Sequence, residues 1–341
     1  MADVVRIGVI GASGFAGSEL VRLAAAHPGV EIAWQTADSQ AGTAVADLYP
    51  ALAAGYPDER YVAYDPALLD GVDVAVLGLP HGASQALVPQ LIGKVDKVID
   101  LAADFRHDRP EIYDEWYGEP HGAPELLERF VYGLPELYRD RLRGADLVAA
   151  PGCYPTSTIL PLAALVRAGV IDPSRVIVDA ACGVSGAGRP PKDNTTFCAV
   201  DENFTAYGVL HHRHTPEMEA HTGATVLFTP HLLPTNRGIL STIYGQVAGE
   251  WTTETALAAL ADAYRGEPFV VVAERLPATK GAQGSNVAHL SVRVDQRTGT
   301  VVAFGAIDNL VKGTAGQALQ CLNLMMGWDE TLGLPLTGVM P

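Results

Sequence analysis

The feature that most constrains the fold is a glycine triplet near the start of the chain. In "GVIGASGFAGSELVRL", Gly11, Gly14 and Gly17 directly follow an apolar run and directly precede an amphipathic segment. Glycines at a strand-to-helix turn let a pyrophosphate approach backbone N–H groups at the positive end of the helix. A merely tight turn is the alternative. The position at the first strand–helix junction of an alternating region favours a dinucleotide-binding loop.

The first half of the chain alternates short apolar runs with amphipathic segments. Strands are expected at 4–10, 30–36, 72–79, 97–103 and 145–150, and helices at 18–27 and 83–92. This rhythm predicts a Rossmann-type parallel sheet covered on both faces. The two halves are expected to divide near residue 151.

The second half of the chain has strands in blocks rather than in alternation with helices. They are expected at 175–182, 224–233, 238–247, 269–274, 286–295 and 299–308, after a helix at 156–168 and before a last helix at about 314–326. Blocks of strands predict an α+β domain with a largely antiparallel sheet.

Composition excludes several classes of protein. The net charge of −16 is not that of a general nucleic-acid binder, so an anionic ligand would depend on local cations and helix N-termini. The four cysteines show no C-x-x-C spacing and indicate reduced thiols rather than a zinc site. No signal peptide or membrane span is recognised, so we expect a soluble cytoplasmic protein.

The stretch "VAAPGCYPTSTILPLAAL" places Cys153 between a strand and a helix. The helix is expected to begin at Pro155, since proline suits the first helical turn. A sulfur just ahead of a helix N-terminus is stabilised as thiolate, and Gly152 leaves room for a substrate carbonyl. A buried structural thiol is the alternative. The framing favours a catalytic nucleophile.

A thiolate that captures an acyl group needs a proton-transfer partner. "HHRHTPEME" offers His212 and His214, which share one face if the segment is extended, and one of them would serve as acid/base. The His-x-His alternation also fits a metal site, but nothing with matching spacing supplies further ligands, so no metal is expected. Of the other histidines, only His81 merits attention.

Loop cations and the residues after the second strand bear on ligand binding. Arg106 and Arg189 are plausible contacts for a carboxylate and a phosphate in so acidic a chain. Asp38 lies where NAD-binding proteins hold the ribose, whereas the adjacent Ser39 is compatible with NADP. The residues alone leave both cofactors open.

Eight motifs in order carry a family resemblance: "GASGFAGSELVRL", "LGLPHGAS", "LAADFR", "AAPGCYPTSTILPL", "GVSGAGR", "HRHTPEM", "FTPHLLPTNRGI" and "NLVKGTAGQALQ". The chain resembles the N-acetyl-γ-glutamyl-phosphate reductase family of the semialdehyde dehydrogenase superfamily. The resemblance implies a glyceraldehyde-3-phosphate dehydrogenase-like fold. Residues 1–151 and 312–341 would form the dinucleotide-binding domain, and 152–311 the catalytic and oligomerisation domain of a homodimer or homotetramer.

The resemblance also implies the reaction. An acyl phosphate of arginine biosynthesis would be reduced with NADPH to N-acetylglutamate 5-semialdehyde and phosphate, through a thioester on Cys153. His214 would be the acid/base, and His212 would hold substrate. Implied substrate contacts are Arg106, Arg189, Arg213 and Ser185. Implied cofactor contacts are Gly11, Ser13, Gly14, Phe15, Gly17, Ser39, Pro80, Asn309 and Lys312.

Three other functions remain open at this point. Aspartate-semialdehyde dehydrogenase performs the same chemistry on a shorter acyl phosphate, but typically has Asn where this chain has Gly152. A lysine-pathway aminoadipyl-phosphate reductase would need a basic face for its acidic carrier, which the net charge disfavours. A non-catalytic NADP-binding redox sensor would need no acid/base.

Overall fold

The computed structural model describes residues 4–340, so the outer limits 1 and 341 of the expected domains lie outside the described residues. The chain forms two compact units, each described here by itself. Unit 1 comprises the residues up to 114 together with 119–151 and 314–334. Unit 2 comprises 115–118, 152–313 and the residues from 335 onward.

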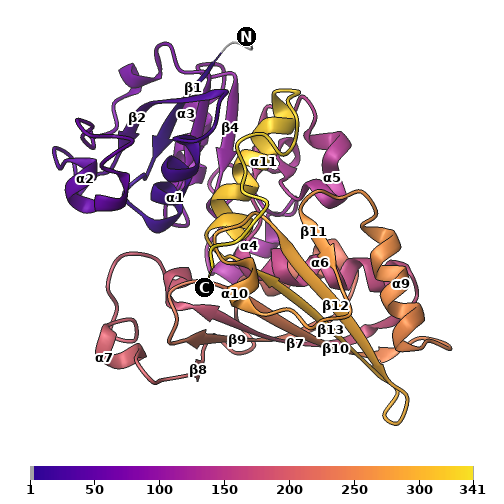
Figure 1. The fold of residues 1–341 in the computed structure, drawn as a ribbon. Helices are drawn as coiled ribbons and strands as arrows, with labels where there is room; N and C mark the ends of the chain where they lie inside the picture. Colours follow the sequence, from indigo (N-terminus) through magenta and orange to yellow (C-terminus); the bar gives the residue numbers. More distant parts are fainter. Residues whose placement is uncertain (1–3, 341) are drawn as a thin grey trace. The chain divides into compact units, whose positions relative to one another are not determined.

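Unit 1 is built on a parallel six-stranded sheet with the order β2-β1-β3-β4-β6-β5 (Figure 1). Its strands are β1 Val5–Ile10, β2 Val30–Thr36, β3 Val74–Leu77, β4 Lys97–Asp100, β5 Val131–Tyr132 and β6 Leu147–Ala149. Its helices are α1 Phe15–Ala24, α2 Val45–Leu48, α3 Ala83–Leu91, α5 Pro135–Leu142 and α11 Gly316–Met325. The parallel Rossmann-type sheet is confirmed, because buried apolar strands alternate with helices as the sequence pattern requires.

Unit 2 is built on a seven-stranded sheet with the order β11-β12-β13-β10-β7-β9-β8 (Figure 1). Its strands are β7 Ile171–Gly183, β8 Thr205–Ala206, β9 Val226–Leu233, β10 Ile239–Val247, β11 Val270–Val272, β12 Ala288–Asp295 and β13 Thr300–Ile307. The largely antiparallel sheet is confirmed, although the β7–β9 and β11–β12 pairs are parallel.

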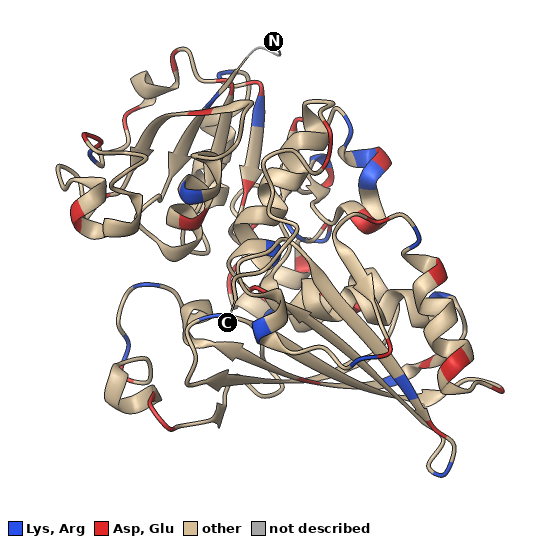
Figure 2. Cartoon of the chain, in the orientation of Figure 1, with Lys and Arg blue, Asp and Glu red and all other residues tan. Residues whose placement is uncertain are grey.

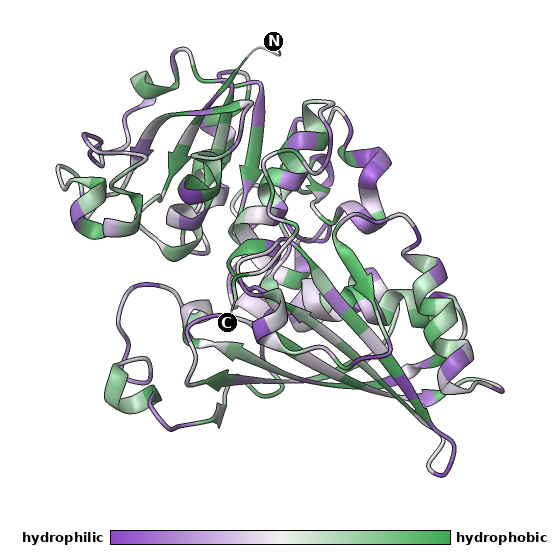
Figure 3. Ribbon diagram, viewed as in Figure 1, coloured by the Kyte–Doolittle hydropathy of each residue, from purple (hydrophilic) through white to green (hydrophobic). Residues whose placement is uncertain are grey.

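Helices cover one face of the unit 2 sheet. They are α6 Cys153–Arg167 and α9 Thr253–Ala263, and both contact strands of the sheet and each other. The shorter helices are α7 Phe197–Val200, α8 Thr215–Thr222 and α10 Thr279–Ala282, while α4 Glu111–Tyr117 spans the unit boundary. Burial alternates along β7, with Val178, Ala180 and Cys182 buried, so these side chains face the helices. Figure 3 shows the hydrophobic residues of the strands in green.

Two expectations about local backbone structure were wrong. Helix α6 begins at Cys153 rather than Pro155, because Gly152 already has the extended backbone of an N-cap. The histidine stretch is a turn entering α8, with His214 as the N-cap, rather than an extended segment. The last helix, expected at about 314–326, is confirmed as α11 at Gly316–Met325, after a π-helical turn at Val311–Ala315.

Charged side chains are spread over both units rather than gathered in one large basic face (Figure 2). Across residues 4–340, no helix combines the length and apolarity needed to cross a membrane.

Candidate active site

Cys153 is the first residue of α6, and its side chain is half-buried. The first-turn N–H groups of a helix have no intrahelical acceptor, and their partial positive charge stabilises a thiolate. Gly313 packs directly against this residue: a Cβ added at Gly313 would lie 2.8 Å from Cys153 Cβ. The nucleophile therefore sits in a space that only a glycine at 313 leaves open.

Glu217 holds the turn that leads into α6. The Gly152 N–H donates to Glu217 Oε1 at 2.7 Å, and the Glu217 side chain is fully buried. Glu217 belongs to α8, so this bond ties the N-terminus of α6 to the helix that follows the histidines. Glu217 was not among the predicted site residues, although its position in the His-Arg-His-Thr-Pro-Glu motif was an available signal.

His212 and His214 are brought together beside Tyr154, the residue after the nucleophile. The two imidazole centroids lie 4.8 Å apart, and those of His212 and His214 lie 5.7 and 6.0 Å from the Tyr154 ring. The rings of Tyr207 and Phe228 also pack against His212, with centroids 5.6 and 5.2 Å from the imidazole centroid. Both histidines therefore belong to the same cluster as the start of α6.

The environment of His212 fixes its protonation. Burial, with a smaller contribution from the charge of Arg213, lowers the pKa of His212 to about 4, so this imidazole is neutral at neutral pH. Its Nδ1 accepts the backbone N–H of His214 at 3.2 Å, which places its proton on Nε2. His212 is therefore a neutral N–H donor. Such a group suits a substrate oxygen better than it suits general acid catalysis.

A second thiol lies next to Cys153. The Cys182 side chain is in hydrogen-bond contact with Cys153, and this bond together with burial raises the pKa of Cys182 well above its ordinary value. Cys182 also donates to Gly183 O at 3.2 Å. Its sulfur is accommodated because residue 186 is glycine, whose Cβ would lie 2.7 Å from Cys182 Sγ.

Two of the expected cofactor contacts, Asn309 and Lys312, are buried in unit 2. The Asn309 amide donates to Ser185 Oγ at 2.9 Å and accepts the Gly238 N–H at 2.8 Å. Lys312 is fully buried, with Nζ 5.6 Å from the Phe269 ring centroid. Both side chains are therefore enclosed by other residues of the protein.

The three arginines expected to bind substrate differ in their surroundings. Arg106, in unit 1, is buried and donates Nε to Ala150 O at 2.8 Å and Nη2 to Leu101 O at 2.9 Å. In unit 2, Arg189 is half-buried after the "GVSGAG" turn. Arg213 is exposed, with its guanidinium 5.3 Å from the Tyr117 ring centroid. Arg237, also in unit 2, pairs with the buried Asp308 at 3.5 Å.

The glycine loop of unit 1 has the shape of a phosphate cradle. Gly11 has φ of +84°, and a Cβ there would lie 2.5 Å from Gly78 O. A Cβ at Gly17 would lie 2.7 Å from Ala12 Cα. Gly14 is the N-cap of α1, so Phe15 begins the helix whose first-turn N–H groups point toward the loop. These residues fit a dinucleotide pyrophosphate.

A buried carboxylate supports the loop that carries Pro80. Asp104 accepts the Gly82 N–H at 2.9 Å and pairs with His81 Nδ1 at 2.5 Å. Burial alone would raise the pKa of Asp104, but these hydrogen bonds outweigh it and lower the pKa. Asp104 therefore fixes the turn while Pro80 remains exposed.

The loop after β2 offers groups for the adenosine end of a dinucleotide. Asp38 and Ser39 are both exposed there. Arg60, which was not among the predicted site residues, donates Nη1 to Gly42 O at 2.8 Å and so lies beside the same loop. Arg60 is separated from the loop by some twenty residues of sequence, which is why no local motif indicated it.

Comparison with known proteins identifies the chain's relatives. A family model described as "Semialdehyde dehydrogenase, NAD binding domain" matches residues 6–145, and one described as "Semialdehyde dehydrogenase, dimerisation domain" matches 153–309. The chain is 47% identical to the N-acetyl-gamma-glutamyl-phosphate reductase of Desulforudis audaxviator, covering 99% of this chain and 100% of the relative. It is 44% identical to that of Pseudomonas putida, with the same coverage. The chain belongs to the N-acetyl-γ-glutamyl-phosphate reductase family.

Solved structures of aspartate-semialdehyde dehydrogenases share the fold. That of enzyme II from Vibrio cholerae, complexed with ASA, superposes with a TM-score of 0.72 at 16% identity, covering 96% of this chain and 99% of that chain. That from Candida albicans with NADP gives 0.70 at 15% identity, covering 95% and 98%. The glyceraldehyde-3-phosphate dehydrogenase-like architecture expected of the family is thus confirmed. Unit 1 contains a nicotinamide-dinucleotide-binding domain and unit 2 a dimerisation domain.

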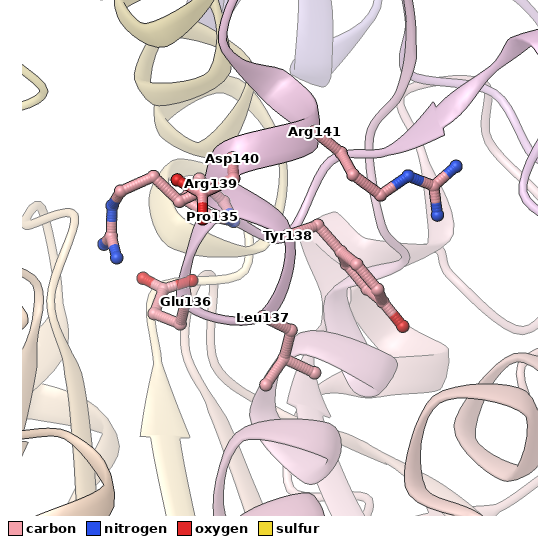
Figure 4. A pocket seen from close by; sticks show the side chains of 7 residues that line it. All are labelled: Pro135, Glu136, Leu137, Tyr138, Arg139, Asp140 and Arg141. Atoms are coloured by element: carbon pink, nitrogen blue, oxygen red, sulfur yellow. The ribbon is translucent and has the colours of Figure 1, made fainter.

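Two hollows elsewhere carry no comparable chemistry. One, of about 290 Å³, lies along α5, where the helix is kinked at Tyr138 and Arg141 turns toward the Tyr138 ring (Figure 4). Its neighbour Arg139 is already paired with Glu330 at 2.8 Å. The other, of about 410 Å³, is an apolar groove beside β11 and β12 with exposed Arg275 and Lys280 at its rim.

Proposed function

We propose that this chain reduces N-acetyl-γ-glutamyl phosphate to N-acetylglutamate 5-semialdehyde and phosphate, as a cytoplasmic enzyme of arginine biosynthesis. The observation that carries the proposal is the cluster at the start of α6. It joins a helix-terminal thiol, two histidines and a buried carboxylate in a chain 47% identical over its length to a relative of that name.

In this proposal Cys153 attacks the acyl carbon and expels phosphate. The new carbon–sulfur bond forms a thioester, and the positive end of α6 stabilises the oxyanion of the tetrahedral intermediate. Glu217, through the Gly152 N–H, holds the backbone from which the sulfur projects. Gly313 leaves the acyl group room beside the sulfur.

The two histidines have different proposed roles, proton transfer and substrate binding. His214 is proposed as the acid/base that protonates the developing alkoxide and then assists release of the thiolate. His212, neutral and with its proton on Nε2, donates a hydrogen bond to substrate. Arg106, Arg189 and Arg213 are the proposed cations for the substrate's carboxylate and phosphate, and Ser185 a further polar contact.

The nicotinamide cofactor, when bound, supplies the hydride that reduces the thioester to the aldehyde level. Its pyrophosphate is proposed to bind at Gly11, Ser13, Gly14, Phe15 and Gly17. Pro80, Asn309 and Lys312 are the further proposed cofactor contacts.

NADP is the proposed cofactor in spite of Asp38. The carboxylate of Asp38 favours a free ribose 2′-hydroxyl and hence NAD. Arg60 beside the same loop supplies the cation that a 2′-phosphate needs, and Ser39 a hydroxyl donor.

Assembly as a homodimer or homotetramer is proposed through the sheet of unit 2. The face of the sheet opposite α6 and α9 leaves Leu227 46% and Tyr244 38% exposed. Both are large apolar side chains on neighbouring parts of one sheet, which is typical of an interface.

The test is the reverse reaction, phosphate-dependent oxidation of purified semialdehydes with NADP or NAD. We expect N-acetylglutamate 5-semialdehyde with NADP to be the best pair. Faster oxidation of aspartate semialdehyde would favour that enzyme instead, and absence of turnover with either aldehyde would overturn the proposal.

A further inference from the structure

Two thiols meet at the proposed nucleophile, and they differ in access. Cys153 is half-buried, so a small solute reaches it, whereas Cys182 is only 2% exposed. The two side chains are already in hydrogen-bond contact, and Cys182 lies on the face of β7 that α6 covers. The two thiols are therefore neighbours in the folded protein.

We propose that Cys153 and Cys182 form a reversible intramolecular disulfide when the protein meets a hydroperoxide. The proposal rests on the proposed function only in taking Cys153 as the nucleophile, so that its oxidation stops turnover. Cys182 is then a resolving thiol. It traps the sulfenic acid of Cys153 as a disulfide, which a dithiol can reduce, before the sulfur is oxidised irreversibly to sulfinic acid.

The chemistry proceeds in two balanced steps. The Cys153 thiolate attacks one peroxide oxygen and breaks the O–O bond, giving a sulfenic acid and, with hydrogen peroxide, hydroxide that takes up a proton to become water. The Cys182 sulfur then attacks the Cys153 sulfur. The S–S bond forms, the S–O bond breaks, and the hydroxyl leaves with the Cys182 proton as water. Two thiols are oxidised and one peroxide is reduced.

The local environment orders these steps. In the reduced protein the hydrogen bond with Cys153, burial and the negative charge of the Cys153 thiolate all raise the pKa of Cys182. Conversion of Cys153 to a neutral sulfenic acid removes that charge, so Cys182 gives up its proton more readily. Cys182 is thus activated only after Cys153 has been oxidised.

The disulfide requires the sulfurs to close from hydrogen-bond contact to a bond length of about 2.05 Å, and the neighbouring glycines leave room for that movement. Cys153 is the terminal residue of its helix, preceded by Gly152 and faced by Gly313. Cys182 lies at the end of β7, next to Gly183 and opposite Gly186. Each cysteine therefore lies beside glycines, Cys153 at the start of α6 and Cys182 near the end of β7.

The experiment treats the purified full-length protein with excess hydrogen peroxide and follows it by mass spectrometry and activity. Trypsin releases Cys153 in residues 144–167 and Cys182 in residues 176–192. We expect these peptides joined, two hydrogens lighter than their sum, and separated by dithiothreitol. Absence of the joined peptide, with Cys153 carried to sulfinic acid instead, would overturn the proposal.

Cys182→Ser and the control Cys198→Ser, which changes an exposed thiol on α7, separate this role from general thiol damage. Each variant is compared with its own untreated activity. After long exposure we expect dithiothreitol to restore at least fivefold less activity in Cys182→Ser than in wild type or Cys198→Ser. Equal recovery in all three would contradict the proposal. The peptide readout needs no turnover, so a joined peptide in a protein inactive on the acyl phosphate would refute only the proposed function.

Discussion

Replacement of Gly313 by alanine should disable the proposed nucleophile while leaving the fold intact. The added methyl would lie 2.8 Å from Cys153 Cβ and 3.2 Å from Ile307 Cδ1. Carbon atoms in favourable contact lie about 3.5–4.0 Å apart, so Cys153 must retreat by about 1 Å. A displacement of about 1 Å at a reacting group costs about 100-fold in rate, whereas overpacking costs about 1–3 kcal/mol of stability.

We therefore expect Gly313→Ala to lower kcat about 100-fold, with the KM for NADPH changed less than threefold. Gly281→Ala is the matched control, because a Cβ at that position meets nothing within 4 Å. Steady-state kinetics and the rate of iodoacetamide labelling of Cys153 would be measured for both. Wild-type kcat and labelling in Gly313→Ala would refute the assignment of this contact to the reacting sulfur.

The remaining predictions concern four other residues. His214→Ala should lower kcat by about 10²–10⁴-fold with NADPH binding retained, and unchanged output would favour the redox sensor. Glu217→Ala should destabilise the protein by about 1–3 kcal/mol, because the Gly152 N–H loses its buried acceptor; Glu217→Gln should restore most of the loss in a denaturant titration. Arg60→Ala should raise the KM for NADPH at least about tenfold, the order of one lost charge-assisted contact, and leave that for NADH unchanged, whereas equal effects on both would exclude a 2′-phosphate contact. Burial and the nearby Asp104 raise the pKa of Asp100 to about 7 in the folded chain. The unfolded chain releases this proton near pH 4. The free energy of unfolding should therefore fall by up to about 1.4 kcal/mol per pH unit as the pH rises from 4 to 7. Asp100→Asn keeps the acceptor for Ser84 and should remove that slope, so parallel stability curves for the two proteins would contradict it.

The sequence predicted the architecture well because each half has a distinct pattern. Alternation of apolar runs and helices marked the parallel sheet, and blocks of strands marked the second sheet. Boundaries were less accurate where tertiary contacts decide them. Helix α6 starts two residues before Pro155 because the extended Gly152 caps it and its N–H is held by Glu217.

The candidate site was predictable only where one motif carried it. Cys153, His212 and His214 stand in motifs whose composition indicated chemistry. Cys182 and Arg60 owe their positions to pairings between distant segments, which no local pattern reveals. The protonation of His212 likewise depends on burial among aromatic neighbours from α6, β9 and the segment after β8.

The central claim is that the sulfur of Cys153 takes the acyl group from the phosphate. Its most direct test is mass spectrometry of the protein mixed with N-acetyl-γ-glutamyl phosphate in the absence of any nicotinamide cofactor. We predict release of one phosphate per chain, with one N-acetylglutamyl group on the peptide spanning residues 144–167, and neither in Cys153→Ser. An unmodified Cys153 peptide, or an acyl group carried elsewhere in the chain, would contradict the account.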